Sequence, residues 1–232
     1  LELGGSDPFI VLADADIEAA AAVGVKARFQ NTGQSCISSK RFIVEASVAE
    51  RFVDAFVALT QKLVVGDPMA AGTTIGSMAR RNLRDELHAQ VVASVGEGAR
   101  LLTGGNPIDG PGAFYQPTVL DHVSPSMTVA REETFGPAAA IIRVNSVDEA
   151  ITVANGTPFG LGASLWTRDM DRARRLTHQI DCGAVFVNGM VASDPRLPFG
   201  GTKQSGYGRE LGYLGLHEFT NIKTVWTGPA KT

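Results

Sequence analysis

The sequence predicts an α/β domain with a largely parallel sheet flanked by helices. Short apolar runs of β type alternate with helical runs along most of the chain, and such alternation is typical of parallel sheets. Hydrophobic residues make up 44% of the 232 residues, which is enough to fill a sizeable core. The chain is therefore long enough for one large domain or two small ones.

The first part of the chain predicts two strands and three helices. A strand over residues 8–12 leads into an Ala-rich helix over 17–29, which Asp14 or Asp16 caps by accepting backbone N–H bonds. Its small side chains place that helix in the interior. Residues 40–45 form the next strand, and Ser47 with Glu50 has the form of a capping box. Apolar residues at helical spacing mark the two helices that follow, with Val48, Phe52, Phe56, Leu59 and Leu63 in one and Leu83, Leu87, Val91 and Val95 in the other.

The second part continues the alternation. Extended segments are expected at 100–103, 115–123, 137–144, 161–166 and 184–187. Ser146 with Glu149 forms a second capping box, for a helix that ends near Gly156, and Asp169 caps a helix after it. The tail, residues 218–226, is of β type with no helix after it. It pairs with another subunit or forms a simple edge strand.

Charge and hydropathy exclude several classes of partner. A formal net charge of −3 leaves no basic stripe for nucleic acid. No apolar run approaches the roughly 20 residues of a membrane span, and no signal segment opens the chain. Two cysteines far apart form no disulfide framework. We therefore expect a cytoplasmic protein with neither nucleic acid nor membrane as partner. The chain begins abruptly on Leu1, so we also expect it to be a piece of a longer protein.

Several familiar catalytic and cofactor motifs are missing from the sequence. The four histidines are scattered without metal-ligand spacing, so no metal site is expected. No serine-hydrolase elbow of the form G-x-S-x-G is present. Neither G-x-G-x-x-G after a strand nor a phosphate-binding P-loop occurs. Any dinucleotide site must therefore rely on residues outside this chain.

Cys36 is the best candidate for chemistry, because it follows Gly33 at a bend between a helix and a strand. A thiol becomes a nucleophile when a partly exposed, electropositive or amide-rich setting lowers its pKa, and such a loop can supply one. The alternative is an inert buried cysteine. Glu2 beside a Gly pair is a general base if burial raises its pKa, or otherwise a solvated terminus. Cys182 has no motif around it and is interpreted as structural.

Four segments resemble, in order, motifs of the aldehyde dehydrogenase superfamily. They are Leu1-Glu2-Leu3-Gly4-Gly5, Gly33-Gln34-Ser35-Cys36, Glu132-Glu133-Thr134-Phe135-Gly136-Pro137, and Pro198-Phe199-Gly200-Gly201 with Lys203-Gln204-Ser205-Gly206. Together they span nearly the whole chain, and the likeness is closest to bacterial succinate semialdehyde dehydrogenases around residues 193–198 and 216–219. The resemblance implies a catalytic domain over 1–217 without its cofactor domain. It also implies an oligomerisation strand over 218–232 and a homo-oligomeric full-length protein.

The resemblance also implies a role for each matching position. Cys36 attacks the aldehyde carbon, a hydride leaves to NAD or NADP, and a water deprotonated by Glu2 hydrolyses the resulting thioester. Glu133 holds the nicotinamide ribose, Phe135 lies near the nicotinamide, and Phe199 lines the site where cofactor and substrate meet. The backbone N–H of Cys36 helps to hold the oxyanion.

Recognition of the substrate carboxylate is expected to differ from the usual pattern of the family. Many relatives of the semialdehyde type carry an arginine six residues before the nucleophile, where this chain has Gln30. Another cation is then needed, and Arg196 is the favoured candidate because bidentate pairing suits a carboxylate. Ser193 adds a hydrogen bond, and Arg28 is a weaker candidate.

Two other functions fit the residues without the resemblance. A thiol and a general base acting without cofactor would hydrolyse activated esters through an acyl-enzyme. Alternatively, the chain is a non-catalytic assembly domain, in which case Cys36 reacts no faster than Cys182.

Overall fold

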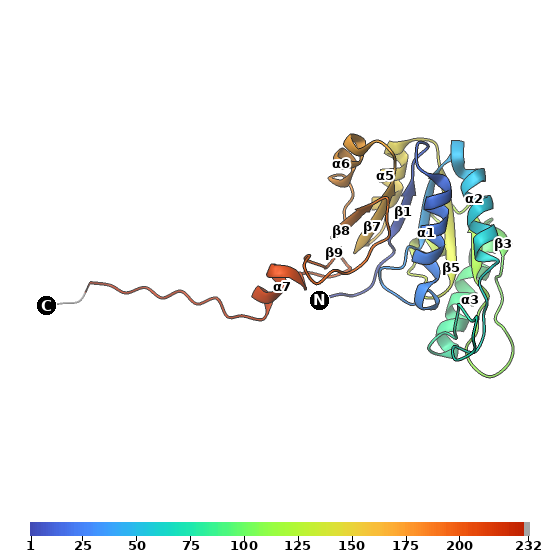
Figure 1. The fold of residues 1–232 in the computed structure, drawn as a ribbon, viewed down its shortest axis with the longest axis horizontal. Helices are drawn as coiled ribbons and strands as arrows, with labels where there is room; N and C mark the ends of the chain where they lie inside the picture. Colours follow the sequence, from blue (N-terminus) through green and yellow to red (C-terminus); the bar gives the residue numbers. More distant parts are fainter. Residues whose placement is uncertain (230–232) are drawn as a thin grey trace.

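The computed structural model describes residues 1–229 of the chain as an α/β domain with an extended C-terminal segment (Figure 1). Seven strands form the main sheet in the order β3-β4-β5-β2-β1-β7-β8. Every neighbouring pair in it is parallel except β3 with β4, which is antiparallel. The prediction of a largely parallel sheet flanked by helices is therefore confirmed.

The elements follow one another much as the sequence predicts. The strands of the main sheet are β1 (Pro8–Val11), β2 (Arg41–Glu45), β3 (Arg100–Thr103), β4 (Thr118–Asp121), β5 (Ala138–Val144), β7 (Gly162–Trp166) and β8 (Ala184–Val187). The helices are α1 (Ile17–Phe29), the 3₁₀ turn η1 (Gln30–Gly33), α2 (Ala46–Thr60), α3 (Arg81–Gly96), α4 (Thr128–Arg131), α5 (Val147–Asn155), α6 (Met170–Thr177) and α7 (Gly212–Glu218). A small second sheet pairs β6 (Phe159–Gly160) with β9 (Thr202–Lys203).

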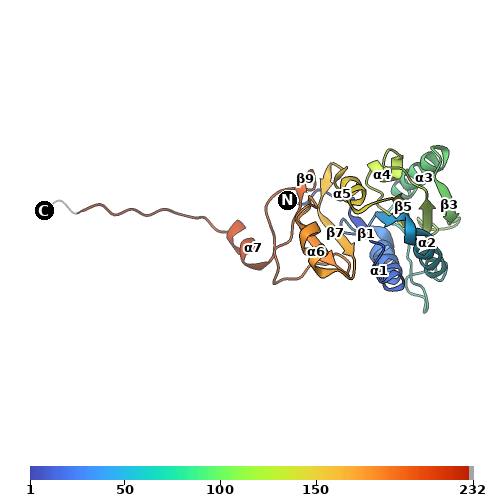
Figure 2. The same cartoon turned by 90° about the horizontal axis from the view of Figure 1, so that it is seen from above.

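Two apolar clusters cover the two faces of the main sheet. Alternate residues of β1 point to opposite faces, so Phe9 and Val11 join one cluster while Ile10 joins the other. Helices α1 and α2 contribute to the first cluster, and α3, α5 and α6 contribute to the second. The two views show α1 and α2 on one side of the sheet and α3 and α5 on the other (Figures 1 and 2). Helix α1 is buried mainly along one side, because Ile17, Ala20, Ala21 and Gly24 lie inward while Glu18 is exposed.

Three of the predicted caps form and one does not. Asp16, Ser146 and Asp169 each accept a backbone N–H three residues ahead, from Ala19, Glu149 and Arg172. The capping box predicted at Ser47 is wrong. Helix α2 begins one residue earlier, at Ala46, so Ser47 already lies inside its first turn.

The C-terminal segment differs from the sequence prediction. Glu218 is the last residue of α7, and residues 219–229 form no strand with any described residue. A strand over 218–226 is thus wrong for this chain alone, because a strand needs a hydrogen-bonded neighbour and the segment runs away from the sheet (Figures 1 and 2). The last three residues of the predicted 218–232 strand, 230–232, lie outside the described residues.

No helix within residues 1–229 is both long and apolar enough to cross a membrane.

Candidate active site

The four motif segments meet at one edge of the sheet, where its parallel strands begin. Residues 1–7 lead into β1, residues 30–40 into β2 and residues 132–137 into β5. The segment 198–206 reaches the same edge, because Leu3 donates a hydrogen bond to the Ser205 carbonyl (3.0 Å) and Gly160 donates one to Ser205 Oγ (2.9 Å). Parallel strands start at a common edge, so segments far apart in the sequence become neighbours.

A tight left-handed turn positions the loop of Cys36. Asn31, Thr32 and Gly33 all have positive φ, at 51°, 57° and 70°. Asn31 stabilises the turn, because its side chain donates to the Gln34 carbonyl at 2.7 Å. A side chain at position 33 would collide with the Gly136 carbonyl, so glycine is required where the two loops pack. We call residues 33–39 the thiol loop.

The Cys36 thiol is half-buried rather than freely exposed. Cys36 packs against a small apolar cluster of Leu161, Val191 and Phe199. Burial raises the pKa of the Cys36 thiol and the nearby Glu2 carboxylate raises it further, while the Lys40 ammonium lowers it. The loop can supply a setting that lowers a thiol pKa, but here the pKa of Cys36 is raised, because desolvation outweighs the effect of the buried Lys40 cation. The backbone N–H of Cys36 donates to no other residue in 1–229 and is free for a ligand.

Glu2 is anchored at the edge of the site. A β-bridge joins Glu2 to Gly206, so this part of the chain is not a frayed terminus. Glu2 is largely exposed, and its partial desolvation raises the pKa of its carboxyl group, which the charge of Glu210 raises further. The sequence did not predict a role for Glu210, because no motif indicates that its carboxylate lies near that of Glu2. Its backbone pairs with Phe199 at 2.8 and 2.7 Å, and this pairing brings it to the site.

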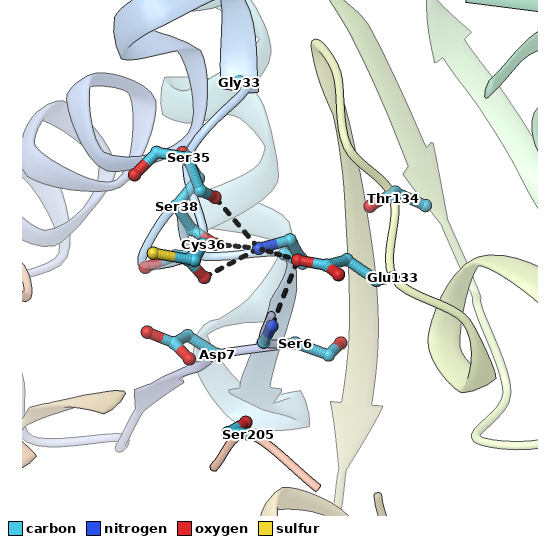
Figure 3. Close-up of polar contacts among 12 residues, drawn as sticks. Ser6, Asp7, Gly33, Ser35, Cys36, Ser38, Glu133, Thr134 and Ser205 are labelled. Atoms are coloured by element: carbon cyan, nitrogen blue, oxygen red, sulfur yellow. Dashed lines mark hydrogen bonds and ion pairs between the residues drawn. The ribbon is translucent and has the colours of Figure 1, made fainter. Parts of the chain in front are cut away.

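Glu133 lies on the other side of the thiol loop. Its Oε1 accepts a hydrogen bond from the Gly5 backbone at 3.0 Å and lies 3.6 Å from the Lys40 ammonium. Figure 3 shows the Cys36 sulfur pointing away from Glu133, and Asp7 directly precedes β1. Phe135, two residues on, is 39% exposed, whereas Phe199 is buried.

Two buried cations hold this edge together, and the sequence reasoning overlooked what they do. Arg28 donates to the carbonyls of Gly33, Ser39, Thr134 and Gly136, so it ties the thiol loop to the loop of Glu133. Lys40 Nζ donates to the carbonyls of Ser35, Cys36 and Ser38. Arg28 thus faces inward with both Nη atoms engaged, while its buried Nε has no hydrogen-bond partner among the described residues. No pattern in the sequence around Arg28 or Lys40 distinguishes a buried cation from an exposed one.

The predicted carboxylate-binding residues make no hydrogen bond or ion pair with Cys36 within residues 1–229. The side chain of Arg196 is 85% exposed and pairs with Asp194 through two hydrogen bonds of 2.9 and 2.6 Å. Ser193 is also exposed. Gln30 lines a shallow surface pocket with Phe29, Leu63 and Ile75, and Cys36 is not among the lining residues of that pocket. Within residues 1–229 no three His, Cys, Asp or Glu side chains gather as metal ligands.

Fold and site together define an α/β domain that presents a thiol and two carboxylates at the amino edge of its sheet. The chain belongs to the aldehyde dehydrogenase family, because the family model described as "Aldehyde dehydrogenase family" matches residues 1–225.

Relatives of known name share about half of its residues. The chain is 53% identical over 226 residues to "Succinate semialdehyde dehydrogenase [NAD(P)+] Sad" of Escherichia coli K12, covering 97% of this chain and 49% of that protein. It is 50% identical over its whole length to "Succinate-semialdehyde dehydrogenase [NADP(+)]" of Mycobacterium avium, covering 49% of that protein. The chain thus spans about half the length of the curated relatives it matches.

Solved structures share the fold closely. The structure titled "Structural insights into cofactor and substrate selection by Gox0499" superposes with a TM-score of 0.95 at 42% identity, covering 98% of this chain and 50% of that one. The succinate-semialdehyde dehydrogenase from Burkholderia pseudomallei superposes with a TM-score of 0.92 at 39% identity, covering 94% of this chain and 45% of that one.

Proposed function

We propose that this chain is the thiol-bearing part of an NAD(P)-dependent aldehyde dehydrogenase that oxidises succinate semialdehyde to succinate. The observation that carries the proposal is the position of Cys36, which packs against the buried Phe199 and lies near enough to Glu2 for that carboxylate to raise the thiol pKa. The names of the relatives from Escherichia coli and Mycobacterium avium support this choice of substrate.

In this proposal Cys36 is the nucleophile. Its raised pKa keeps the thiol protonated at neutral pH, so a base must accept the proton as sulfur attacks the aldehyde carbon. The Glu2 carboxylate lies close enough to raise the thiol pKa, and its own raised pKa suits proton transfer. The free backbone N–H of Cys36 stabilises the oxyanion. Glu2 then releases the thiol proton to solvent, and after oxidation the regenerated carboxylate deprotonates the water that hydrolyses the Cys36 thioester.

Two residues of the chain suit a nicotinamide riboside. Glu133 Oε1 is held by Gly5, and no residue in 1–229 donates a hydrogen bond to Oε2, which leaves this oxygen for a ribose hydroxyl. Phe135 exposes part of its ring for contact with a planar ligand. When bound, the nicotinamide supplies the hydride acceptor of the reaction. The remaining contacts to the dinucleotide are assigned to parts of the full-length protein beyond this chain.

The experiment exchanges the two thiols of the full-length protein separately. Cys36→Ser should abolish the formation of reduced nicotinamide from succinate semialdehyde, because serine is a far weaker nucleophile at neutral pH. Cys182→Ser is the matched control and should retain activity, because burial raises the pKa of Cys182 to about 12 and its thiol donates to the Ala184 carbonyl. Retained oxidation in Cys36→Ser would remove Cys36 as the nucleophile. Ester hydrolysis without cofactor and without aldehyde oxidation would favour the esterase, and no turnover by the wild-type protein would favour the assembly domain.

The substrate carboxylate is assigned to Arg196 with Ser193. Arg196 already pairs with Asp194, so a substrate must compete for the guanidinium or share it. Arg196→Leu should reduce kcat/KM for succinate semialdehyde by about 30-fold or more, as expected for a lost charge-assisted pair, and should spare an uncharged aldehyde of similar length. Equal losses on the two aldehydes would assign Arg196 to loop structure instead.

A further inference from the structure

Among residues 1–229, Lys40 is the lysine whose ammonium group binds the carbonyls of the thiol loop. Its side chain is fully buried at the start of β2. Nζ donates to the carbonyls of Ser35 at 3.2 Å, Cys36 at 2.9 Å and Ser38 at 3.2 Å. An ammonium group has three N–H donors, and the thiol loop uses all three. Figure 3 shows these contacts converging on one nitrogen.

The same ammonium group is the shared neighbour of the thiol loop and Glu133. Glu133 Oε1 lies 3.6 Å from Lys40 Nζ and belongs to the loop that precedes β5. The Cys36 sulfur points away from Glu133 (Figure 3). A change at the Glu133 carboxylate thus has no direct route to the sulfur. Lys40 Nζ contacts both the Glu133 carboxylate and the carbonyls of the thiol loop, so it is the group through which we expect such a change to act.

The pKa of Lys40 depends on the charge of Glu133 and of other groups around its ammonium group. Burial and the Arg28 guanidinium lower the pKa of Lys40, while the carboxylates of Asp7 and Glu133 and the thiolate form of Cys36 favour its charged form. Asp7 is itself buried, which raises its pKa, and it faces Lys40 and Arg41. A buried ammonium group is costly unless its partners offset the desolvation. Its partners here are the carbonyls of the thiol loop and the carboxylates of Asp7 and Glu133.

We propose that Lys40 is a positioning residue that couples the thiol loop to Glu133, so that a change at the Glu133 carboxylate alters the reactivity of Cys36. With the ammonium group present, the carbonyls of the thiol loop have a fixed donor and the field at the sulfur favours the thiolate. This coupling does not depend on the proposed function. Only the assignment of Glu133 to the nicotinamide ribose rests on it. With that assignment, the same contact links occupancy of the cofactor site to the state of the nucleophile.

The test is a double-mutant cycle on Cys36 labelling in the full-length protein. Iodoacetamide modification at pH 7 is followed peptide by peptide with mass spectrometry in wild type, Lys40→Met, Glu133→Gln and the double variant. Lys40→Met should slow labelling of Cys36 by about three- to tenfold, because the charge that lowers the thiol pKa is gone. Glu133→Gln should slow it by a smaller factor, because it weakens the charged form of Lys40.

The double variant decides the proposal. If Lys40 carries the coupling, Glu133→Gln should have no further effect on the labelling of Cys36 in the Lys40→Met background. Two results would overturn the proposal: equal slowing by Glu133→Gln in both backgrounds, or no slowing by Glu133→Gln at all. A purely structural role of Lys40 would not produce this dependence on Glu133.

Three controls keep the cycle interpretable. Cys182 labelling in the same samples reports general loosening of the fold, because the charge of Lys40 is not among the causes of its raised pKa. Lys62→Met removes an exposed lysine and should leave both thiols unchanged. If Lys40→Met does not fold, the cycle is run with Lys40→Gln, which is neutral but keeps donors for the loop carbonyls. Labelling needs neither aldehyde nor cofactor, so its outcome is separate from that of the proposed function.

Discussion

The pKa values of Cys36 and Glu2 each depend on a neighbouring carboxylate at the edge of the sheet. The ionised Glu2 raises the pKa of the Cys36 thiol, and the ionised Glu210 raises that of Glu2. Proton transfer from the thiol to Glu2 therefore becomes easier as the pKa of Glu2 approaches that of Cys36. Burial, together with repulsion between carboxylates, thus raises the pKa of the Glu2 base above its ordinary value.

Replacing Glu210 should change the pH dependence of the reaction. A base acts in its ionised form, so activity falls as the pH drops through its pKa. Glu210→Gln removes one cause of the raised pKa of Glu2, so the acidic limb of the kcat/KM profile should move to lower pH. The backbone pairing of residue 210 with Phe199 is kept. Glu86→Gln, an exposed acid on α3, is the control, and an acidic limb that stays in place would remove Glu210 from the site.

Sequence motifs located the thiol, Glu2 and Glu133, whereas the partners that tune them remained hidden. Cys36 and Glu2 sit in short recognisable segments, so their positions follow from local residue order. Glu210 and Glu2 come from opposite ends of the chain and meet only through the bridges of Phe199 and Gly206. Lys40 was included in a strand, because a lysine before an apolar run has no pattern that reveals a buried ammonium group.

At the scale of elements, the loops that enter the strands carry the site. Apolar alternation predicted most strands and helices to within a few residues, because each buries a defined face. The edge at which the motifs gather did not follow from that pattern, since it depends on the order of β5, β2 and β1 in the sheet. The small pair β6 and β9 was also missed, because two-residue strands have no periodicity.

Packing between the thiol loop and the Glu133 loop can be tested at Gly33. A Cβ there would lie 2.4 Å from the Gly136 carbonyl oxygen and 2.6 Å from Arg28 Nη2, and φ is +70°. Gly72 has φ of +89° with nothing within 4 Å of its Cβ position, so it shares the backbone cost without the collision. Gly72→Ala should destabilise by about 1 kcal/mol, and Gly33→Ala by several times as much.

Urea unfolding midpoints of the full-length protein measure this difference, and Cys36 labelling reports whether the thiol loop has moved. Similar midpoints for Gly33→Ala and Gly72→Ala would mean that the two loops are free to separate without cost. Retained labelling with a lowered midpoint would separate loop stability from thiol placement.

At the scale of the whole molecule, the C-terminal segment exposes apolar side chains that no other part of residues 1–229 covers. Phe219, Ile222, Val225 and Trp226 are all at least 78% exposed. Exposed apolar side chains concentrated in one segment are typical of an interaction surface. The β-type composition of this segment gives it backbone donors and acceptors for a strand edge on another subunit. Pairing between subunits is therefore the proposed role of the segment, since residues 219–229 pair as a strand with no other described residue.

Truncation after Glu218 should shift the full-length protein towards smaller species, because it removes the exposed apolar segment and keeps α7 intact. The milder double variant Ile222→Ser/Trp226→Ser should weaken assembly in the same direction, since burial of each large apolar side chain contributes about 1.5–3 kcal/mol. Met69, which is 90% exposed in a different part of the chain, provides the matched control, and Met69→Ser should leave the assembly unchanged. Light scattering across a dilution series measures the mass of each variant. An unchanged mass after truncation would show that the subunits assemble through another surface, and a loss of mass in Met69→Ser would show that any exposed apolar residue contributes.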